Sequence, residues 1–206
     1  MYSPKTLKSN NSFPVLSGTK PININGFSYK NPPPFYLSKK YIEAIANYGE
    51  WYFEFASIFH ETYKSPNYTA DNFMKYFKDY CGIGYEIICY IPKTNNDPMG
   101  RWNWTNNEKK DIEIFVANNL SVEVKKTTII HESLHALQEI DESFKRKISK
   151  YPLDLQTPII ERITNKTMVE IVLPKMEFLQ CIKKGWTKKQ ISRHYNVSRQ
   201  LVNNYF

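Results

Sequence analysis

A short motif in the middle of the chain constrains its fold more than any other feature. Residues 127–138 form an apolar run whose centre, residues 131–135, reads His-Glu-Ser-Leu-His, an HExxH pattern. On a helix, residues four apart lie one turn apart on the same face, which places the imidazoles of His131 and His135 side by side. Two such imidazoles can bind one Zn²⁺, and Glu132 can take a proton from a metal-bound water. The motif predicts a helix and suggests a zinc-dependent peptidase.

A five-residue motif also occurs by chance on half-buried helices, so its setting matters. The two motif histidines are half of the 4 histidines in the chain. Ile130, Leu134 and Leu137 repeat at i, i+4 and i+7, which gives an apolar stripe beside them. We therefore predict a helix over residues 121–140, with Ser121 as its N-cap.

Length and composition narrow the class of protein. The 206 residues suffice for one domain and an appendage, and 41% are hydrophobic. Three cysteines without C-x-x-C spacing argue against a disulfide framework and a cysteine-based zinc site. No apolar run reaches the roughly 18 residues that span a bilayer, and the start of the chain has no apolar signal region. These observations predict a soluble, cytoplasmic protein that has no membrane partner.

The order of predicted elements gives an α+β fold, mainly helical, with a small antiparallel or mixed sheet of about three strands. Proline-rich residues 1–35 read as a poorly ordered arm. Helices are expected over residues 38–63 and 70–80. A further helix should begin at Thr157 and Pro158, as N-cap and first residue, and should end at Pro174.

Three β-rich stretches, residues 85–91, 101–105 and 111–116, are expected to form the sheet. In a metallopeptidase, an edge strand beside the metal helix commonly pairs with an extended substrate. We nominate the stretch 111–116 for this role. Its substrate-binding residues would then be Ile112, Ile114 and Val116.

A catalytic zinc site needs a third protein ligand and an open position. Glu139 lies on the motif helix, where three ligands cannot converge on one ion. Asp141 and Glu142 lie at its end and point away. A carboxylate on a facing helix has better geometry, and Glu161 and Glu170 both qualify.

The segment 161–174 resembles the second signature of the ImmA/IrrE metallopeptidase family, which has a metal-binding Glu, an Asn four residues later and an apolar triplet closing on Pro. Glu161 and Asn165 fall in register with it. The resemblance covers roughly residues 82–206. It implies that His131, His135 and Glu161 bind one Zn²⁺ and that Glu132 is the general base.

The sequence departs from the family pattern at a few positions. Leu134 stands where the family usually has Gly, and Thr164, Thr167 and Met168 replace smaller residues. These departures bear on how closely side chains pack around the site. They remove no atom that the chemistry needs.

Positive charge gathers in the C-terminal third, where residues 143–206 carry 13 Lys and Arg against 4 Asp and Glu. Residues 186–205 have the form of a helix-turn-helix, with Asn196 at the turn. Outward-facing residues of its second helix would read DNA bases, as such helices do; they are Arg199, Gln200, Asn203 and Asn204. The alternative is a helical module that completes the protease fold or docks a partner.

We divide the chain into the arm at 1–35, a zincin-like metallopeptidase domain at 36–175 and a helix-turn-helix-like module at 176–206. The resemblance implies a regulatory zinc endopeptidase, often from a phage or mobile element, whose protein substrate is a helix-turn-helix repressor. The other hypotheses are a DNA-binding regulator with a structural or vestigial zinc site, and an anti-repressor that acts by binding alone.

Overall fold

The computed structural model describes most of the chain from residue 54 onward. The described residues are 22–24, 27–29, 54–63, 66, 68–94, 96–106, 108 and 110–204. Most of the predicted arm and the first part of the helix predicted over 38–63 lie outside them. Within the described part of the arm, strands β1 (Ile22–Ile24) and β2 (Phe27–Tyr29) pair antiparallel. Residues 54–62 are helical.

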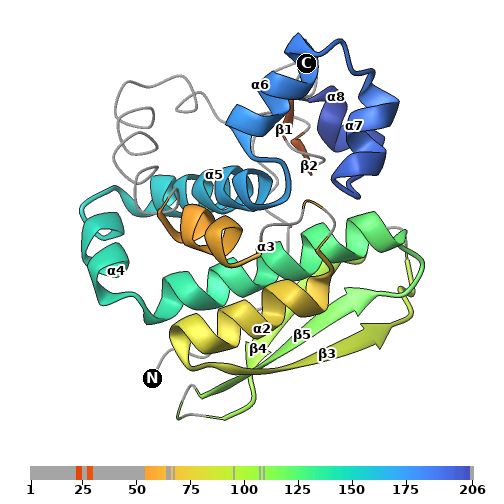
Figure 1. Ribbon diagram of the computed structural model, residues 1–206. Coiled ribbons are helices and arrows are strands. Elements are labelled where there is room, and N and C mark those ends of the chain that lie inside the picture. The colour runs from red at the N-terminus through yellow and green to blue at the C-terminus, as the bar shows by residue number, and fades with distance from the viewer. Residues whose placement is uncertain are drawn as a thin grey trace, which may run out of the picture.

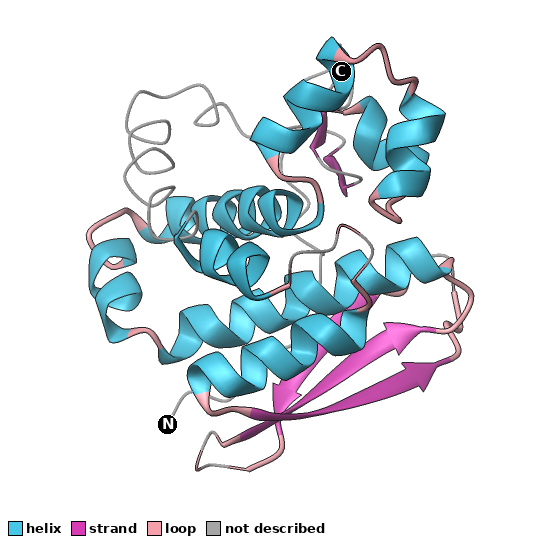
Figure 2. Ribbon diagram, viewed as in Figure 1, coloured by secondary structure: helices cyan, strands magenta, loops and turns pink. Residues whose placement is uncertain are grey.

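A small mixed sheet forms one side of the molecule (Figure 2). Its strands are β3 (Gly84–Tyr90), β4 (Gly100–Trp104) and β5 (Asp111–Ala117), in the order β3-β5-β4. Strand β5 pairs parallel with β3 and antiparallel with β4. The predicted α+β fold with a three-stranded sheet is confirmed.

Helices cover one face of this sheet (Figure 1). Helix α2 (Ala70–Cys81) and helix α3 (Val122–Ile140) pack on the sheet, α5 (Leu153–Val172) lies beyond α3, and α4 (Glu142–Ile148) joins α3 to α5. The predicted helices at 70–80 and 121–140 are therefore present. Thr69 begins α2 with a capping box, and the Ser121 side chain accepts a hydrogen bond from the backbone of Val124 to begin α3.

The core runs without a break from the sheet through α3 to the C-terminal helices. These are α6 (Lys175–Lys183), α7 (Lys188–His194) and α8 (Arg199–Asn203). Ile191 and Val202, which are fully buried, belong to the same hydrophobic cluster as Ile130 and Leu134 of α3. Asn196 has the left-handed φ of 49° that was predicted for the turn between α7 and α8.

Burial of α3 fixes the position of the motif. Ile130 and Leu134 have no exposed surface, and burying each such side chain contributes roughly 1.5–3 kcal/mol to folding. Leu134, which stands where the resembled family has Gly, fills the core rather than the site. The face of α3 that carries the motif is thereby held toward α5.

Candidate metal centre

Two residues of the motif meet a third from α5. His131 and His135 follow one another on α3, and their Nε2 atoms are 3.0 Å apart. The two carboxylate oxygens of Glu161 lie 3.5 Å from Nε2 of His131 and 3.3 Å from Nε2 of His135. All three ligand atoms lie within 4.8 Å of one another. The side chains of His131, His135 and Glu161, which come from two different helices, thus converge on one point.

These separations fit a tetrahedral metal site. Ligand atoms bound at about 2.0–2.1 Å in tetrahedral geometry are about 3.3–3.4 Å apart, since the separation is about 1.63 times the bond length. The separation of 3.0 Å between the two nitrogens, and those of 3.3 and 3.5 Å from the nitrogens to the two different oxygens of Glu161, lie around that value. Two imidazole nitrogens and one carboxylate oxygen are also a ligand set that Zn²⁺ uses. The residues present can hold a zinc ion without rearrangement.

Helix α5 starts earlier than the sequence predicted. It begins at Leu153 after Pro152, so the prediction of Thr157 as N-cap and Pro158 as first residue is wrong. Pro158 lies inside the helix instead. Leu155 is buried and extends the apolar face of Ile159 by one turn, which offsets the missing N–H of the proline. Glu161, which follows Pro158, lies in the helix with either start.

The negative charge of the site lies on the half-buried Glu161. Although burial acts to raise the pKa of Glu161, hydrogen bonds from His131 and His135 hold this pKa well below its usual range. Burial acts to lower the pKa of His135. The hydrogen bond and the charge of Glu161 act to raise it and together outweigh burial, so the pKa of His135 lies above its usual value. Glu161 is thus an anion poised beside two nitrogen ligands, as a cation site requires.

Glu132 lies on the sheet side of the same turn of α3. Burial raises the pKa of its carboxyl above the usual range, against the opposite effect of the two histidines. Strand β4 comes close to it at Gly100. A Cβ atom at position 100 would lie 2.3 Å from Cγ2 of Thr128 and 3.1 Å from Oε1 of Glu132. Only glycine allows this approach of the strand to the carboxylate.

A buried hydrogen-bond chain that sequence analysis missed joins α3 to α5 behind the ligands. Nδ1 of His135 is 3.2 Å from Oε1 of Gln138, and Nε2 of Gln138 donates to Oγ1 of Thr164 at 2.9 Å. Thr164 in turn donates to the Ile160 carbonyl. Because the Gln138 oxygen accepts from Nδ1–H of His135, the proton of the neutral ring stays on Nδ1 and Nε2 is left to bind a metal. The signal in the sequence was a glutamine one turn after the second motif histidine, on the buried side of the helix.

The other carboxylates considered as third ligand lie elsewhere. Glu139 accepts a hydrogen bond from Nε1 of Trp104. Asp141 caps helix α4. Glu170, the main competitor of Glu161, accepts from the backbone of Lys175 at the far end of α5. Of the two candidates that the sequence left open, the structure brings Glu161 to the histidines.

The prediction that residues 111–116 form the edge strand that binds the substrate is wrong. Strand β5 is central and pairs on both sides, so its backbone cannot accept an extended peptide. Ile112, Ile114 and Val116 are at most 1% exposed and form the core under α3. The alternation in 111–116 marked one buried face, but the order of strands depends on pairing that alternation does not encode.

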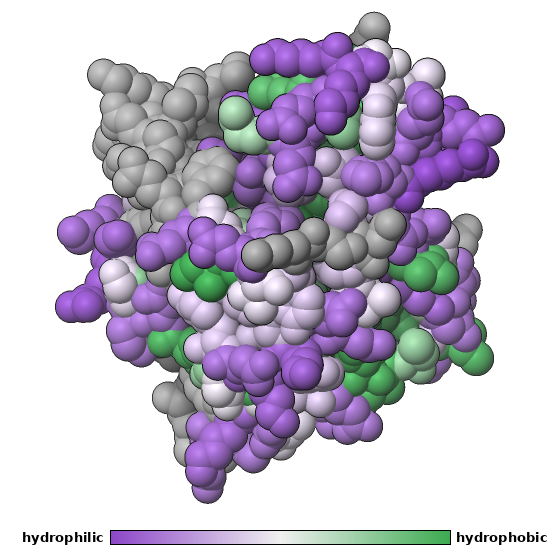
Figure 3. Space-filling model, viewed as in Figure 1, coloured by the Kyte–Doolittle hydropathy of each residue, from purple (hydrophilic) through white to green (hydrophobic). Residues whose placement is uncertain are grey.

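The four residues predicted to read DNA are exposed on and after α8. Arg199, Gln200, Asn203 and Asn204 face solvent, while their neighbours Leu201 and Val202 are buried. Hydrophilic side chains predominate over α7 and α8, at the upper right of Figure 3. These four side chains are therefore accessible to a partner.

Comparison with known families finds one matching domain model. The model of the IrrE N-terminal-like domain, a peptidase M78 family, matches residues 100–205, which include all three ligands and Glu132. A search of the curated proteins found no match. None of the helices in the described part of the chain has the length and apolar character needed to cross a bilayer.

A solved structure shares the fold. It is a Mycobacterium tuberculosis transcriptional regulator, with a TM-score of 0.50 and 12% sequence identity. The alignment covers 79% of this chain and 50% of the regulator, so the chain spans about half the length of that protein. At this identity the likeness concerns the fold alone.

Proposed function

Because the chain belongs to the IrrE N-terminal-like domain family, we propose that it is a zinc-dependent peptidase. The convergence of His131, His135 and Glu161 carries the proposal, because two imidazoles and a carboxylate from two helices are placed at zinc-binding separations. Three protein ligands leave one position open for substrate, which distinguishes a catalytic from a structural zinc site. Glu132, beside the first ligand, is the proposed general base.

When bound, zinc would polarise the scissile carbonyl and lower the pKa of a water molecule toward about 7. Glu132 takes the proton from the attacking water as the oxygen–carbon bond forms. It then gives the proton to the amine as the carbon–nitrogen bond breaks. Burial raises the pKa of Glu132, which brings it closer to neutrality, where one carboxyl group can serve in both steps. Gln138 keeps His135 in the metal-binding tautomer throughout.

Strand β4 replaces β5 as the proposed substrate strand. Within the described residues β4 pairs only with β5, and Gly100 sets its start against Glu132. The register leaves the backbone groups of Gly100 and Trp102 on the side of β4 away from β5. An extended peptide can pair there, which brings its backbone to the open position of the metal.

The proposal extends to the protein substrate of the enzyme and to its location. We propose a cytoplasmic regulatory enzyme whose substrate is a helix-turn-helix repressor. Such a substrate suits a protein that carries an exposed basic region on its C-terminal helices, because charge steers the encounter with an oppositely charged partner.

The test compares wild type with Glu132→Gln, which removes the base but keeps the shape of the side chain. Each variant is produced in cells together with the regulator encoded beside its gene, and new N-termini are identified by mass spectrometry. We expect wild type alone to generate them, while Glu132→Gln retains its zinc. Glu123→Gln, on the same helix but away from the site, is the matched control and should cleave like wild type. Equal cleavage by Glu132→Gln would remove Glu132 from the mechanism.

A second candidate function is DNA binding or anti-repression without cleavage. The observation that favours it is charge: residues 175–204 carry seven Lys and Arg, all exposed, against one Glu. DNA binding predicts a mobility shift of duplex DNA that weakens steeply with salt and is lost in Arg199→Ala. A shift that is equal at low and high salt would count against it.

A further inference from the structure

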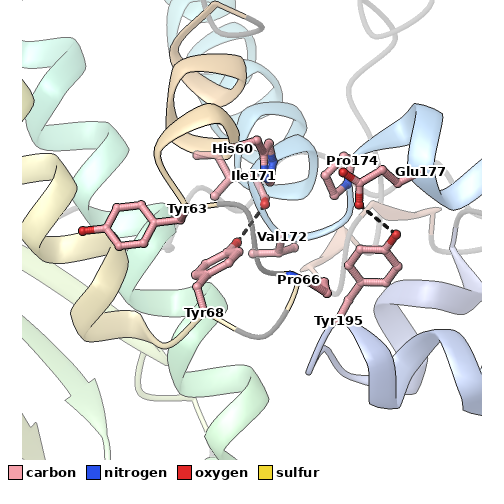
Figure 4. A pocket seen from close by; sticks show the side chains of 9 residues that line it. All are labelled: His60, Tyr63, Pro66, Tyr68, Ile171, Val172, Pro174, Glu177 and Tyr195. Atoms are coloured by element: carbon pink, nitrogen blue, oxygen red, sulfur yellow. Dashed lines mark hydrogen bonds between the residues drawn. The ribbon is translucent and has the colours of Figure 1, made fainter.

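A cavity of about 240 Å³ lies at the junction of the catalytic core and the C-terminal helices, apart from the metal centre. Its walls come from the helical segment 54–62 and the described residues among 63–68 that follow it, the end of α5, the start of α6 and the residue that ends α7 (Figure 4). Cavities for drug-sized ligands begin near 300 Å³. Any ligand that fills this one is therefore small.

Hydroxyl groups of two tyrosines in the wall already donate their hydrogen bonds. Tyr68 donates to the Ile171 carbonyl at 2.8 Å, and Tyr195 donates to Oε2 of Glu177 at 3.1 Å, as Figure 4 shows. Both tyrosines are at most 3% exposed, and the hydrogen bond of Tyr68 is buried, whereas Glu177, the partner of Tyr195, is exposed. A phenol has one O–H, so once that O–H has donated, its oxygen can only accept further hydrogen bonds.

The other polar side chains of the described wall can act as acceptors as well. Nε2 of His60 is 3.2 Å from the Glu170 carbonyl and must donate to it, which leaves Nδ1 as an acceptor in the neutral ring. Pro66 and Pro174 also line the cavity and have no backbone N–H to offer. Glu177 adds a carboxylate with four lone-pair sites, of which Tyr195 uses one. The described side chains of the wall thus offer mostly acceptors.

Aromatic rings in the wall also favour a cationic ligand. Tyr63, Tyr68 and Tyr195 line the cavity, and aromatic faces attract cations. Outside the cavity, the Tyr68 ring already makes such a contact: Nζ of Lys126, from α3, lies 4.9 Å from its centre and donates to the Tyr195 carbonyl. Lys126 approaches from the α3 side and is not part of the cavity lining.

From this acceptor-rich and aromatic lining with a single carboxylate, we propose that the cavity binds a small alkylammonium group. The ammonium would donate to Glu177, and its short carbon chain would lie against the rings and against Val172. An anion of the same size would meet the negative charge of Glu177. The proposal is independent of peptidase activity, because none of these side chains belongs to the metal centre.

The test titrates the full chain with n-butylammonium, 1-butanol and butyrate, three probes of similar size that are cationic, neutral and anionic. Binding is followed by the backbone amide shifts of Val172, Glu177 and Tyr195 in ¹H–¹⁵N NMR spectra. We expect n-butylammonium to bind with a dissociation constant on the order of 1 mM and the other two to bind at least about tenfold more weakly. Equal binding by 1-butanol, or binding of butyrate alone, would overturn the proposal.

A matched pair of variants places the probe. Glu177→Gln keeps an acceptor for the Tyr195 hydroxyl, so the fold is retained, but removes the charge. It should weaken n-butylammonium binding about tenfold or more. Glu61→Gln, next to His60 but outside the lining, should leave binding unchanged; unchanged binding in Glu177→Gln as well would refute the site.

One further arm identifies the source of the ammonium group. Nα-acetyl-lysine methylamide presents the same group on a protein side chain. If it binds as tightly as n-butylammonium, the ligand is a lysine of a protein, and if it binds more weakly, the ligand is a free small amine. Failure of both probes to bind would overturn the proposal.

Discussion

Replacing Gly100 by Ala tests the contact between strand β4 and the proposed base. The new Cβ would lie 2.3 Å from Cγ2 of Thr128, where ordinary contacts begin near 3.4 Å, so the strand and α3 must separate by roughly 1 Å. Overpacking of this kind typically costs about 1–3 kcal/mol of unfolding free energy. The same displacement at Glu132 should lower kcat by up to about a hundredfold.

Thr128→Ser provides a rescue, because it deletes the methyl group that the new Cβ would meet. Alone, it should cost about 0.8 kcal/mol for the lost buried methyl. Combined with Gly100→Ala, the cost should be smaller than the sum of the single costs by about 1 kcal/mol or more. Urea denaturation of the four proteins measures this coupling. Additive costs would show that the clash is not with Thr128 and would refute the reasoning.

Three further predictions follow from the buried groups around the site. Gln138→Leu removes the acceptor of His135 and should weaken zinc binding about 10–100-fold, measured by competition with a chelator, whereas Glu123→Gln should bind zinc like wild type. Ile114→Ala should cost about 2–5 kcal/mol in urea denaturation, because this side chain is core; a cost below 1 kcal/mol would favour the surface role that the sequence suggested. Burial lowers the pKa of Lys126 from its usual range to about 8, so the unfolded chain binds more protons between about pH 8 and pH 10.5. The stability of wild type relative to Lys126→Met should therefore rise across that window, and a flat difference would contradict the burial of a charged amine.

Local pattern predicted the elements that depend on neighbours in sequence. The motif helix, its Ser121 cap and the turn at Asn196 follow from spacing and from the conformations that single residues favour. The start of α5 was misplaced because a proline usually marks the first turn of a helix. Here the burial of Leu155 outweighs that local rule.

Features that depend on distant parts of the chain were harder to predict. Spacing left Glu161 and Glu170 equal, and a family resemblance was needed to choose between them. The order of strands, which buries β5 and leaves β4 beside Glu132, is set by pairing between segments that are not adjacent in sequence. The link from His135 through Gln138 to Thr164 crosses from α3 to α5, and no local pattern encodes it.

Zinc content of purified variants tests the central claim most directly. Wild type and Glu170→Gln should each carry about one zinc ion per chain by elemental analysis, because Glu170 lies at the far end of α5. Glu161→Gln should lose the metal while remaining folded, since Glu161 supplies the carboxylate between the two histidines. Retention of zinc in Glu161→Gln together with its loss in Glu170→Gln would contradict the assignment of the site.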